Sequence, residues 1–231
     1  VTPVAAHVDL TRIESNVEAL ADRLRHVGCG HAIIPHLSGG YFRTKSDIDG
    51  LALRLENLAD RLDSYGIQLS YHVSREPLLP RLDSFGLGPT VDLPTPDVVW
   101  RLLAEAIDLT IRGSARAVET TAFGRLVSQT DDLTFEVDVG WIAAARYDPV
   151  ELFDYLDDRV ALIHVADTRR TRRFPPLYRS VPPGDGILDL DRVLEASRRA
   201  DVDWIVYEDD DPETPETAIR HGSSLFALDS V

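Results

Sequence analysis

The sequence predicts an α/β fold in which helices cover a parallel sheet, and three observations lead to it. Short apolar stretches alternate along the chain with segments whose apolar residues recur at helical spacing. The connections are short, which favours parallel strands joined by crossover helices. The turn after the first strand, "HVDLTRIE", lacks the glycines of a dinucleotide-binding fold. A closed TIM-type barrel is therefore favoured over an open, doubly wound sheet.

The first part of the chain supplies three apolar strands separated by two helices. Thr11 and Glu14 form a capping-box signature, which predicts that the first helix begins there and continues to Gly28. The second helix is expected to begin at Ser46 and to end before Gly66, with leucines along one face. The expected strands are 3–8, 31–37 and 67–73.

The later part of the chain resumes the same alternation after an interruption. Residues 75–115 hold several prolines and glycines, so we expect an insertion with a helix of its own. A short helix over 117–128 follows, and the last helix ends the chain. The later strands are expected at 133–141, 160–167 and 204–210. Residues 1–231 are thus predicted to form one partial barrel domain of about six strands, with 75–115 inserted in it.

The composition excludes several classes of partner. The net charge of -15 argues against nucleic acid, because phosphate binding relies on a surplus of Lys and Arg. No apolar run approaches the length of a membrane span. The single cysteine, Cys29, excludes an internal disulfide framework and fits a reducing compartment. We expect an acidic, cytoplasmic protein that binds neither nucleic acid nor membranes.

The stretch "LTFEVDVGW" places two carboxylates on one face of a buried strand. Side chains alternate along a strand, so Glu136 and Asp138 point away from Phe135 and Val137 and toward the same side. A buried charge without a partner is costly. Asp138 is therefore expected to bind a cation. Glu136 is expected either to orient a ligand of that cation or to pair with an arginine.

Further polar residues stand where other strands end. In a barrel, catalytic groups come from the C-terminal ends of strands. Two carboxylates and two imidazoles converging there would suit Mn²⁺, Co²⁺, Zn²⁺ or Mg²⁺. A single histidine at a strand end is more often a hydrogen-bonded core residue than a metal ligand. His7 and His36 are therefore expected to line the substrate pocket rather than to bind the metal. The strand-end residues are His7, His36, His72, Asp138, His164 and Glu208.

Two loop segments complete the set of candidates. "TRRTRR" (168–173) is expected to be a solvated loop from which Arg170 contacts the substrate. "PGDG" (183–186) is expected to form a simple turn, with an anion site as the alternative. Trp141, at the end of the strand with the two carboxylates, is expected to contact the substrate as well.

The segment "FEVDVGWIAAARYDPVELFDYLDDRVALIHVADTRR" resembles the sugar phosphate isomerase/epimerase family, whose fold is a xylose isomerase-like TIM barrel. "AAHV", "PPGDGILDL" and "WIVYEDD" add to the resemblance, which is strong over about 130–210 and absent across the insertion. It implies that Asp138, His164 and Glu208 hold a divalent cation. It also implies eight strands, so the first two βα units of that barrel are expected to be missing here.

The chain departs from the family where the fourth ligand is expected. Relatives often carry a "YHNHDFEF"-like strand end, or a glutamate ligand, where this chain has "YHVSREPL". His72 remains in the motif, and Ser74 replaces the second histidine. We expect His72 as the fourth ligand. With a histidine in place of one glutamate, the family's symmetric two-glutamate proton exchange is not expected here.

The resemblance implies a metal-dependent isomerase or epimerase of a sugar, keto-sugar or polyol derivative. The metal would stabilise an enediolate, with Glu208 and His72 as the catalytic groups. Two other functions stay open. One is a dehydratase of the inosose or shikimate type. The other is an inactive barrel that binds or assembles with partners, including copies of itself. A nuclease is disfavoured because the chain lacks a basic patch.

Overall fold

The computed structural model describes residues 2–78, 118–173, 176–200 and 202–227. The chain divides into two compact units, Val1–Glu136 and Val137–Val231, and each is described by itself. Most of the predicted insertion at 75–115 lies outside the described residues.

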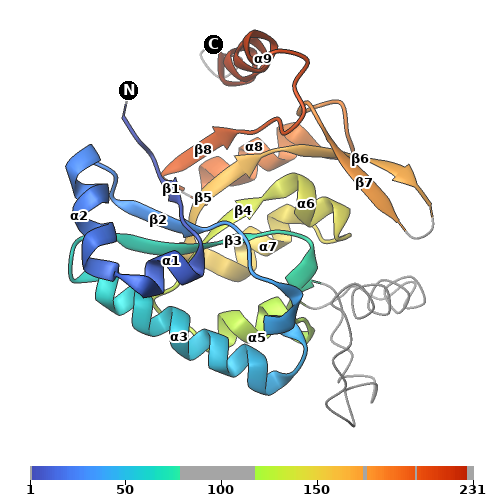
Figure 1. The fold of residues 1–231 in the computed structure, drawn as a ribbon. Coiled ribbons are helices and arrows are strands. Elements are labelled where there is room, and N and C mark those ends of the chain that lie inside the picture. The colour runs from blue at the N-terminus through green and yellow to red at the C-terminus, as the bar shows by residue number, and fades with distance from the viewer. Residues whose placement is uncertain (1, 79–117, 174–175, 201, 228–231) are drawn as a thin grey trace. The chain divides into compact units, whose positions relative to one another are not determined.

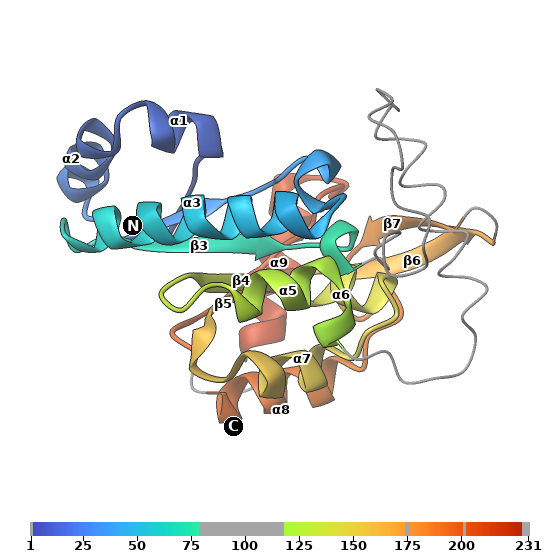
Figure 2. The same ribbon diagram turned by 90° about the horizontal axis from the view of Figure 1, so that it is seen from below.

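The first unit contains the predicted alternation of strands and helices. β1 pairs with β2, and β2 with β3, in parallel register. The 19-residue helix α3 packs along β3 (Figure 2). The strands are β1 (Ala6–His7), β2 (His31–Ile34), β3 (Gln68–Val73) and the start of β4 (Thr134–Asp138). The α-helices are α1 (Leu10–Ser15), α2 (Val17–Val27), α3 (Lys45–Asp63) and α5 (Ala122–Ser128), and short 3₁₀ turns lie at Gly39–Phe42, Glu76–Leu78 and Val118–Thr120.

Helix starts differ from the sequence prediction for a clear reason. The segment expected as one helix from Thr11 is two helices, because Asn16 leaves the helical conformation and its side chain accepts a hydrogen bond from the amide of Ala19. Glu14 does not serve a capping box; it binds the guanidinium of Arg54 on α3. The capping box belongs instead to α3, where Thr44 and Asp47 bond each other reciprocally.

The core of the first unit follows the helical periodicity. α3 buries its predicted leucine face, and each buried leucine contributes about 1.5–3 kcal/mol relative to an exposed one. Gly28 ends α2 in the left-handed conformation, with φ of 74° that a β-carbon would disfavour. The leucines of that face are Leu51, Leu55, Leu58 and Leu62.

The second unit, as far as the structure describes it, contains a parallel strand pair, a hairpin and four α-helices (Figure 1). β5 (Val160–Val165) pairs in parallel with β8 (Trp204–Tyr207), and every residue of β5 is buried, as expected of a parallel strand covered on both faces. β6 (Asp167–Arg172) and β7 (Leu177–Val181) form an antiparallel hairpin. The helices are α6 (Val139–Ala144), α7 (Pro149–Leu156), α8 (Leu190–Arg199) and α9 (Pro215–Ala227).

The strand order confirms the predicted α/β architecture. Six strands form one sheet in the order β1-β2-β3-β4-β5-β8, and β4 contributes residues to both units. The segment "TRRTRR", expected as a loop, is instead strand β6 of the hairpin and the residue after it. Among the described residues, no helix is both long and apolar enough to span a membrane.

Candidate metal centre and the residues around it

β4 buries both of its carboxylates, as its alternation predicts. Glu136 and Asp138 are each 1% exposed. Asp138 is the last residue of β4 and also the N-cap of α6, because its Oδ1 accepts the amide hydrogen of Trp141 at 2.9 Å. The strand therefore turns directly into a helix at the carboxylate, which holds the Asp138 side chain in one orientation.

Three of the predicted ligands come together in the second unit. His164 lies on β5, and Glu208 follows β8, whose pairing with β5 places the two side chains at the same end of the strands. His164 Nδ1 lies 2.8 Å from Glu208 Oε2. One ligand atom each from Asp138, His164 and Glu208 lies within 4.8 Å of the other two.

The chemistry of this cluster fits a divalent cation. Ligand atoms bound at about 2.0–2.2 Å from one ion lie roughly 2.8–3.6 Å apart, and the three ligand atoms here lie within 4.8 Å of one another. One imidazole and two carboxylates are suitable donors for Zn²⁺ or Mn²⁺. Two carboxylates with one of them 1% exposed also repel each other, and a cation removes that repulsion. Asp138, His164 and Glu208 are therefore the residues that would hold the ion.

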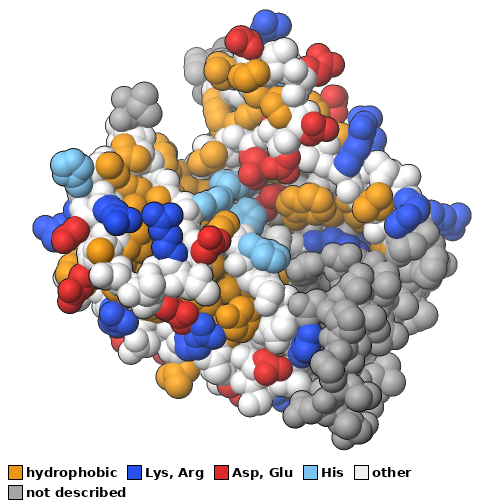
Figure 3. Space-filling model, viewed as in Figure 1, with side chains coloured by type: hydrophobic (Ala, Val, Ile, Leu, Met, Phe, Trp, Pro, Cys, Tyr) orange, Lys and Arg blue, Asp and Glu red, His pale blue; other side chains and the backbone are white. Residues whose placement is uncertain are grey.

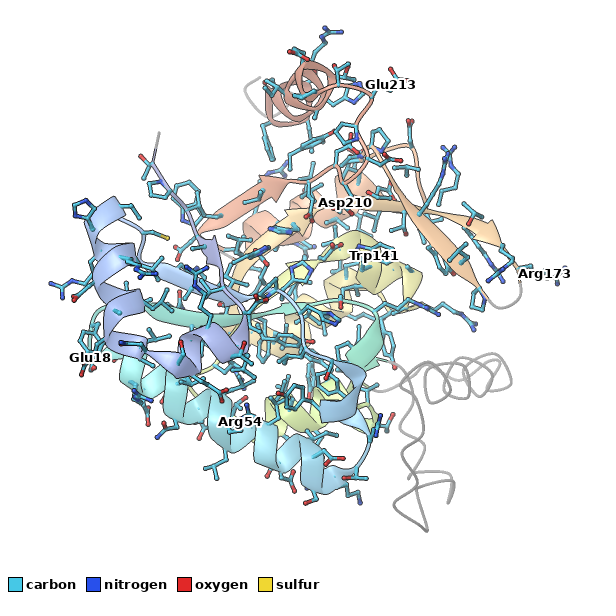
Figure 4. All side chains as sticks on the ribbon, viewed as in Figure 1. Glu18, Arg54, Trp141, Arg173, Asp210 and Glu213 are labelled. Atoms are coloured by element: carbon cyan, nitrogen blue, oxygen red, sulfur yellow. The ribbon has the colours of Figure 1, made fainter. Side chains whose placement is uncertain are left out.

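Asp210 adds a further carboxyl group beside the cluster, and it was not among the residues predicted from the sequence. It lies in the loop after β8 (Figure 4). Burial, followed by the negative charge of Glu208, raises the pKa of the Asp210 carboxyl above its ordinary value. Asp210 could have been identified from the sequence by its position, two residues after the expected ligand Glu208.

The first unit contains a second cluster, built around Glu136. Its Oε2 accepts hydrogen bonds from His7 Nε2 on β1 at 2.8 Å and from His72 Nδ1 on β3 at 2.7 Å. The two imidazole rings stand nearly perpendicular, with centroids 5.8 Å apart. Glu136 thus orients two histidines through one carboxylate oxygen. We call Glu136, His7 and His72 the histidine clamp.

The remaining predicted substrate contacts lie on the surface or close to it. His36 is exposed two residues beyond β2, and Trp141 is partly buried in α6. Arg170 is exposed on β6 and donates to the carbonyl oxygens of Arg172 and Arg173 in its own hairpin. Basic side chains gather over this hairpin (Figure 3). Substrate contacts by these residues stay predictions.

Asp167 is a further buried carboxylate, and the sequence did not single it out. It is fully buried, and its two carboxylate oxygens accept five backbone amide hydrogens. A β-carbon on Gly186 would lie only 2.1 Å from Asp167 Oδ1, so this position requires glycine. The segment "PGDG" is therefore a turn wrapped around an internal carboxylate. The five donors are the amides of Thr168, Gly184, Gly186, Ile187 and Leu188.

The family model described as "Xylose isomerase-like TIM barrel" matches residues 6–227. The chain belongs to this family. The match spans both compact units and agrees with the six-stranded α/β architecture. A comparison with curated proteins gives no match to the chain.

Solved structures show the same fold at low sequence identity. A sugar phosphate isomerase/epimerase from Parabacteroides distasonis superimposes with a TM-score of 0.67 at 16% identity, covering 99% of this chain and 72% of that one. An IolI protein with a bound zinc atom gives 0.63 at 18% identity, covering 98% and 76%. The probable 3-DHS dehydratase AsbF of Bacillus anthracis gives 0.61 at 13%, covering 99% and 76%. At these identities, the likeness establishes the fold alone.

Proposed function

We propose that the chain is a divalent-metal-dependent isomerase or epimerase of a sugar, keto-sugar or polyol derivative. The observation that carries this proposal is the convergence of Asp138, His164 and Glu208 within 4.8 Å, at strand ends of a xylose isomerase-like fold. The bound zinc of the IolI structure supports a cation in this fold, and the P. distasonis protein supports the reaction class.

The cation would be held by Asp138, His164 and Glu208, with His72 as the fourth ligand. When bound, a divalent ion polarises neighbouring carbonyl and hydroxyl oxygens of a substrate, so that the adjacent C–H becomes acidic and an enediolate is stabilised. Mn²⁺, Co²⁺, Zn²⁺ and Mg²⁺ all suit this donor set.

Proton transfer would be performed by the chain's own side chains. The Glu208 side chain is 28% exposed, so it can reach a substrate as well as an ion. It would remove the α-proton and return it to the neighbouring carbon in an isomerisation, whereas an epimerisation needs a second group to deliver a proton to the opposite face. His72, oriented by Glu136, is the second candidate for this task.

Substrate binding is assigned to residues around these groups. His7, His36 and Trp141 would line the pocket, and Arg170 would anchor the substrate after leaving the carbonyl groups of its own hairpin. The proposed partner is a small carbohydrate or polyol, and the single cysteine supports a cytoplasmic location. A homo-oligomer fits the position of β8 at one end of the strand order.

The test is metal content together with product analysis. The purified chain and Asp138→Asn are loaded with Mn²⁺ or Co²⁺, passed over a desalting column and analysed for bound metal. We expect about one ion per chain in the wild type and almost none in the variant. Equal metal in both proteins would reject this site.

Product analysis in D₂O then separates isomerase from dehydratase. Candidate sugars, keto-sugars and polyols are incubated with the loaded protein and followed by NMR. Isomerisation or epimerisation exchanges a carbon-bound proton for deuterium without a change in composition. Dehydration removes one water, and this outcome would replace the isomerase with a lyase. If the wild type binds no metal and converts none of the candidates, the alternative of an inactive barrel that binds partners would be favoured.

A further inference from the structure

The hairpin β6–β7 of the second unit has two different faces, and one of them is exposed to solvent. On β7, the exposed residues Leu177 and Arg179 alternate with the half-buried residues Tyr178 and Ser180. Arg169 on β6 lies directly opposite Arg179. Residues opposite each other in an antiparallel pair point to the same side, so both arginines lie on the exposed side. We call Arg169, Leu177 and Arg179 the arginine face.

The arginine face places two like charges next to each other. Opposite residues of an antiparallel pair have β-carbons about 4.5–5.5 Å apart, and like charges at this spacing destabilise the pair. Arg169 donates through Nη2 to the carbonyl oxygen of Asp185, which holds the side chain but does not neutralise its charge. A guanidinium has five N–H donors, so one such bond does not exhaust them. An anionic partner would therefore relieve a repulsion within the hairpin.

The apolar part of this face favours a protein surface as that partner. Leu177 is 50% exposed and lies on the same side of β7 as Arg179. A small anion would neutralise the arginines but would leave Leu177 in water. A protein surface with carboxylates would do both, because it would also bury apolar area. Arginine is accordingly one of the residues enriched in protein interfaces.

The complementary charge is present on the same chain. Residues 168–181 contain five of the chain's 24 basic residues and no acidic one, which leaves 19 basic against 39 acidic residues elsewhere. Residues 208–216, which we call the acidic segment, hold six acidic residues and no basic one. Asp211, Glu213 and Glu216 of this segment are exposed. A second copy of the chain therefore provides carboxylates that match the arginine face.

Within one copy, the acidic segment begins at the other side of the hairpin. Ser180, on the half-buried side of β7, interacts with Asp210 at the start of the segment. The segment then leads to α9. Figure 4 shows Glu213 close to that helix, whereas Arg173 lies at the far end of the hairpin. The arginine face is therefore expected to meet an acidic segment from another copy and not its own.

We propose that the arginine face binds the acidic segment of a second copy of this chain. Arg169 and Arg179 would pair with carboxylates of that segment, and guanidinium–carboxylate pairs can be bidentate. Leu177 would be covered by the contact. Because every copy has both surfaces, the contact can be made twice in a reciprocal dimer. This association goes beyond the proposed function and does not depend on a metal.

The first experiment is sedimentation of the metal-free chain at low and high salt. We expect a mass above that of one chain at low salt, and dissociation as salt rises, because exposed charges are screened. Arg179→Glu should weaken association about tenfold or more, since it places like charges in the contact. Arg170→Glu is the matched control, because it makes the same charge change on the other side of the hairpin, opposite Tyr178.

Three outcomes of this experiment would overturn the proposal. The first is a wild type that remains a single chain at low salt. The second is an equal loss of association in Arg179→Glu and Arg170→Glu, because net charge and not the arginine face would then control association. The third is association that persists in Arg179→Glu, which would place the contact on another surface, such as the outer edge of β8.

The second experiment exchanges the charges of the two surfaces. One variant combines Arg169→Glu with Arg179→Glu, and the other combines Asp211→Arg, Glu213→Arg and Glu216→Arg. Each variant alone should sediment as a single chain. An equimolar mixture should associate, because each altered surface then meets the opposite charge on the other variant. A mixture that stays dissociated would overturn the proposal.

Thermal unfolding checks that each variant folds before it is mixed. If a multiple variant does not fold, the single variants Arg179→Glu and Glu213→Arg are mixed instead, with the same expected result. None of these substitutions changes Asp138, His164 or Glu208, so metal content can be measured on the same samples. Loss of association with metal content unchanged would support the proposal independently of the metal centre.

Discussion

Asp138 and Asp167 are both buried aspartates of the second unit, and they satisfy their charge in different ways. Asp167 accepts five backbone amide hydrogens, one from the adjacent Thr168 and four from the turn at 184–188. Asp138 accepts the amide of Trp141 and lies in a cluster with a second carboxylate, Glu208. Asp167 is stabilised by the dipoles of neutral amides, whereas Asp138 lies where its charge and that of Glu208 would stabilise a cation. Burial of a carboxylate therefore does not by itself indicate a metal ligand. The polar groups around the carboxylate have to be considered as well.

The largest expected effect is on stability, at Asp167. Asp167→Ala would leave five amides without their acceptor, and hydrogen bonds to a charged group contribute about 1.5–3 kcal/mol each, though not additively. We expect a loss of about 3–5 kcal/mol in the free energy of unfolding, measured in urea. Asp185→Ala, an exposed residue of the same turn, is the control and should change stability by less than about 0.5 kcal/mol.

Gly186→Ala tests the same interaction by changing the turn and leaving Asp167 in place. The added β-carbon would overlap the Asp167 carboxylate, so either the turn or the aspartate must move. We expect a loss of about 2–4 kcal/mol in urea unfolding. Gly30→Ala is the matched control, because no atom lies within 4 Å of the position that its β-carbon would take. Equal stability of the two variants would mean that the turn is not held by Asp167.

Metal-linked stabilisation separates Asp138 from Asp167 most directly. At an Mn²⁺ concentration about 100 times the dissociation constant, binding should stabilise the wild type by about 2.7 kcal/mol, seen as a higher Tm. Asp138→Asn should lose this gain. Asp148→Asn, which keeps the cap of α7 but loses the ion pair with Arg192, should keep this gain. Retention of the gain in Asp138→Asn would contradict the site.

The smallest effect is a pH dependence at Asp210. The raised pKa means that the folded protein holds this proton more tightly than the unfolded chain does. Stability therefore falls as pH rises from the unfolded value, about 3.9, through the raised folded value. Metal-free Asp210→Asn should have a higher Tm than the wild type at neutral pH, and the difference should disappear near about pH 3. Asp211→Asn, which removes a carboxylate from the next position of the same loop, is the control for the loss of one negative charge.

The alternation of apolar residues was sufficient to predict the α/β class and the six strands, and the resemblance selected Asp138, His164 and Glu208 from the strand-end residues. Residues separated by two on a strand share a face, so Glu136 and Asp138 could be paired from the sequence alone. His164 and Glu208 could be placed because both stand where an apolar run ends, and parallel strands bring such ends together. These inferences depend on the local periodicity of apolar residues, which can be observed directly in the sequence.

The tertiary structure decided the partners of the buried charges. Glu136 bonds histidines that lie 129 and 64 residues away, and the register between strands determines which rings reach it. The donors to Asp167 come from a turn that folds back over its carboxylate and needs glycine at position 186. The spacing of apolar residues does not predict this contact. Local spacing determines which face a side chain takes. Only the folded chain determines which donors meet it there, because hydrogen bonds depend on distances between segments remote in sequence.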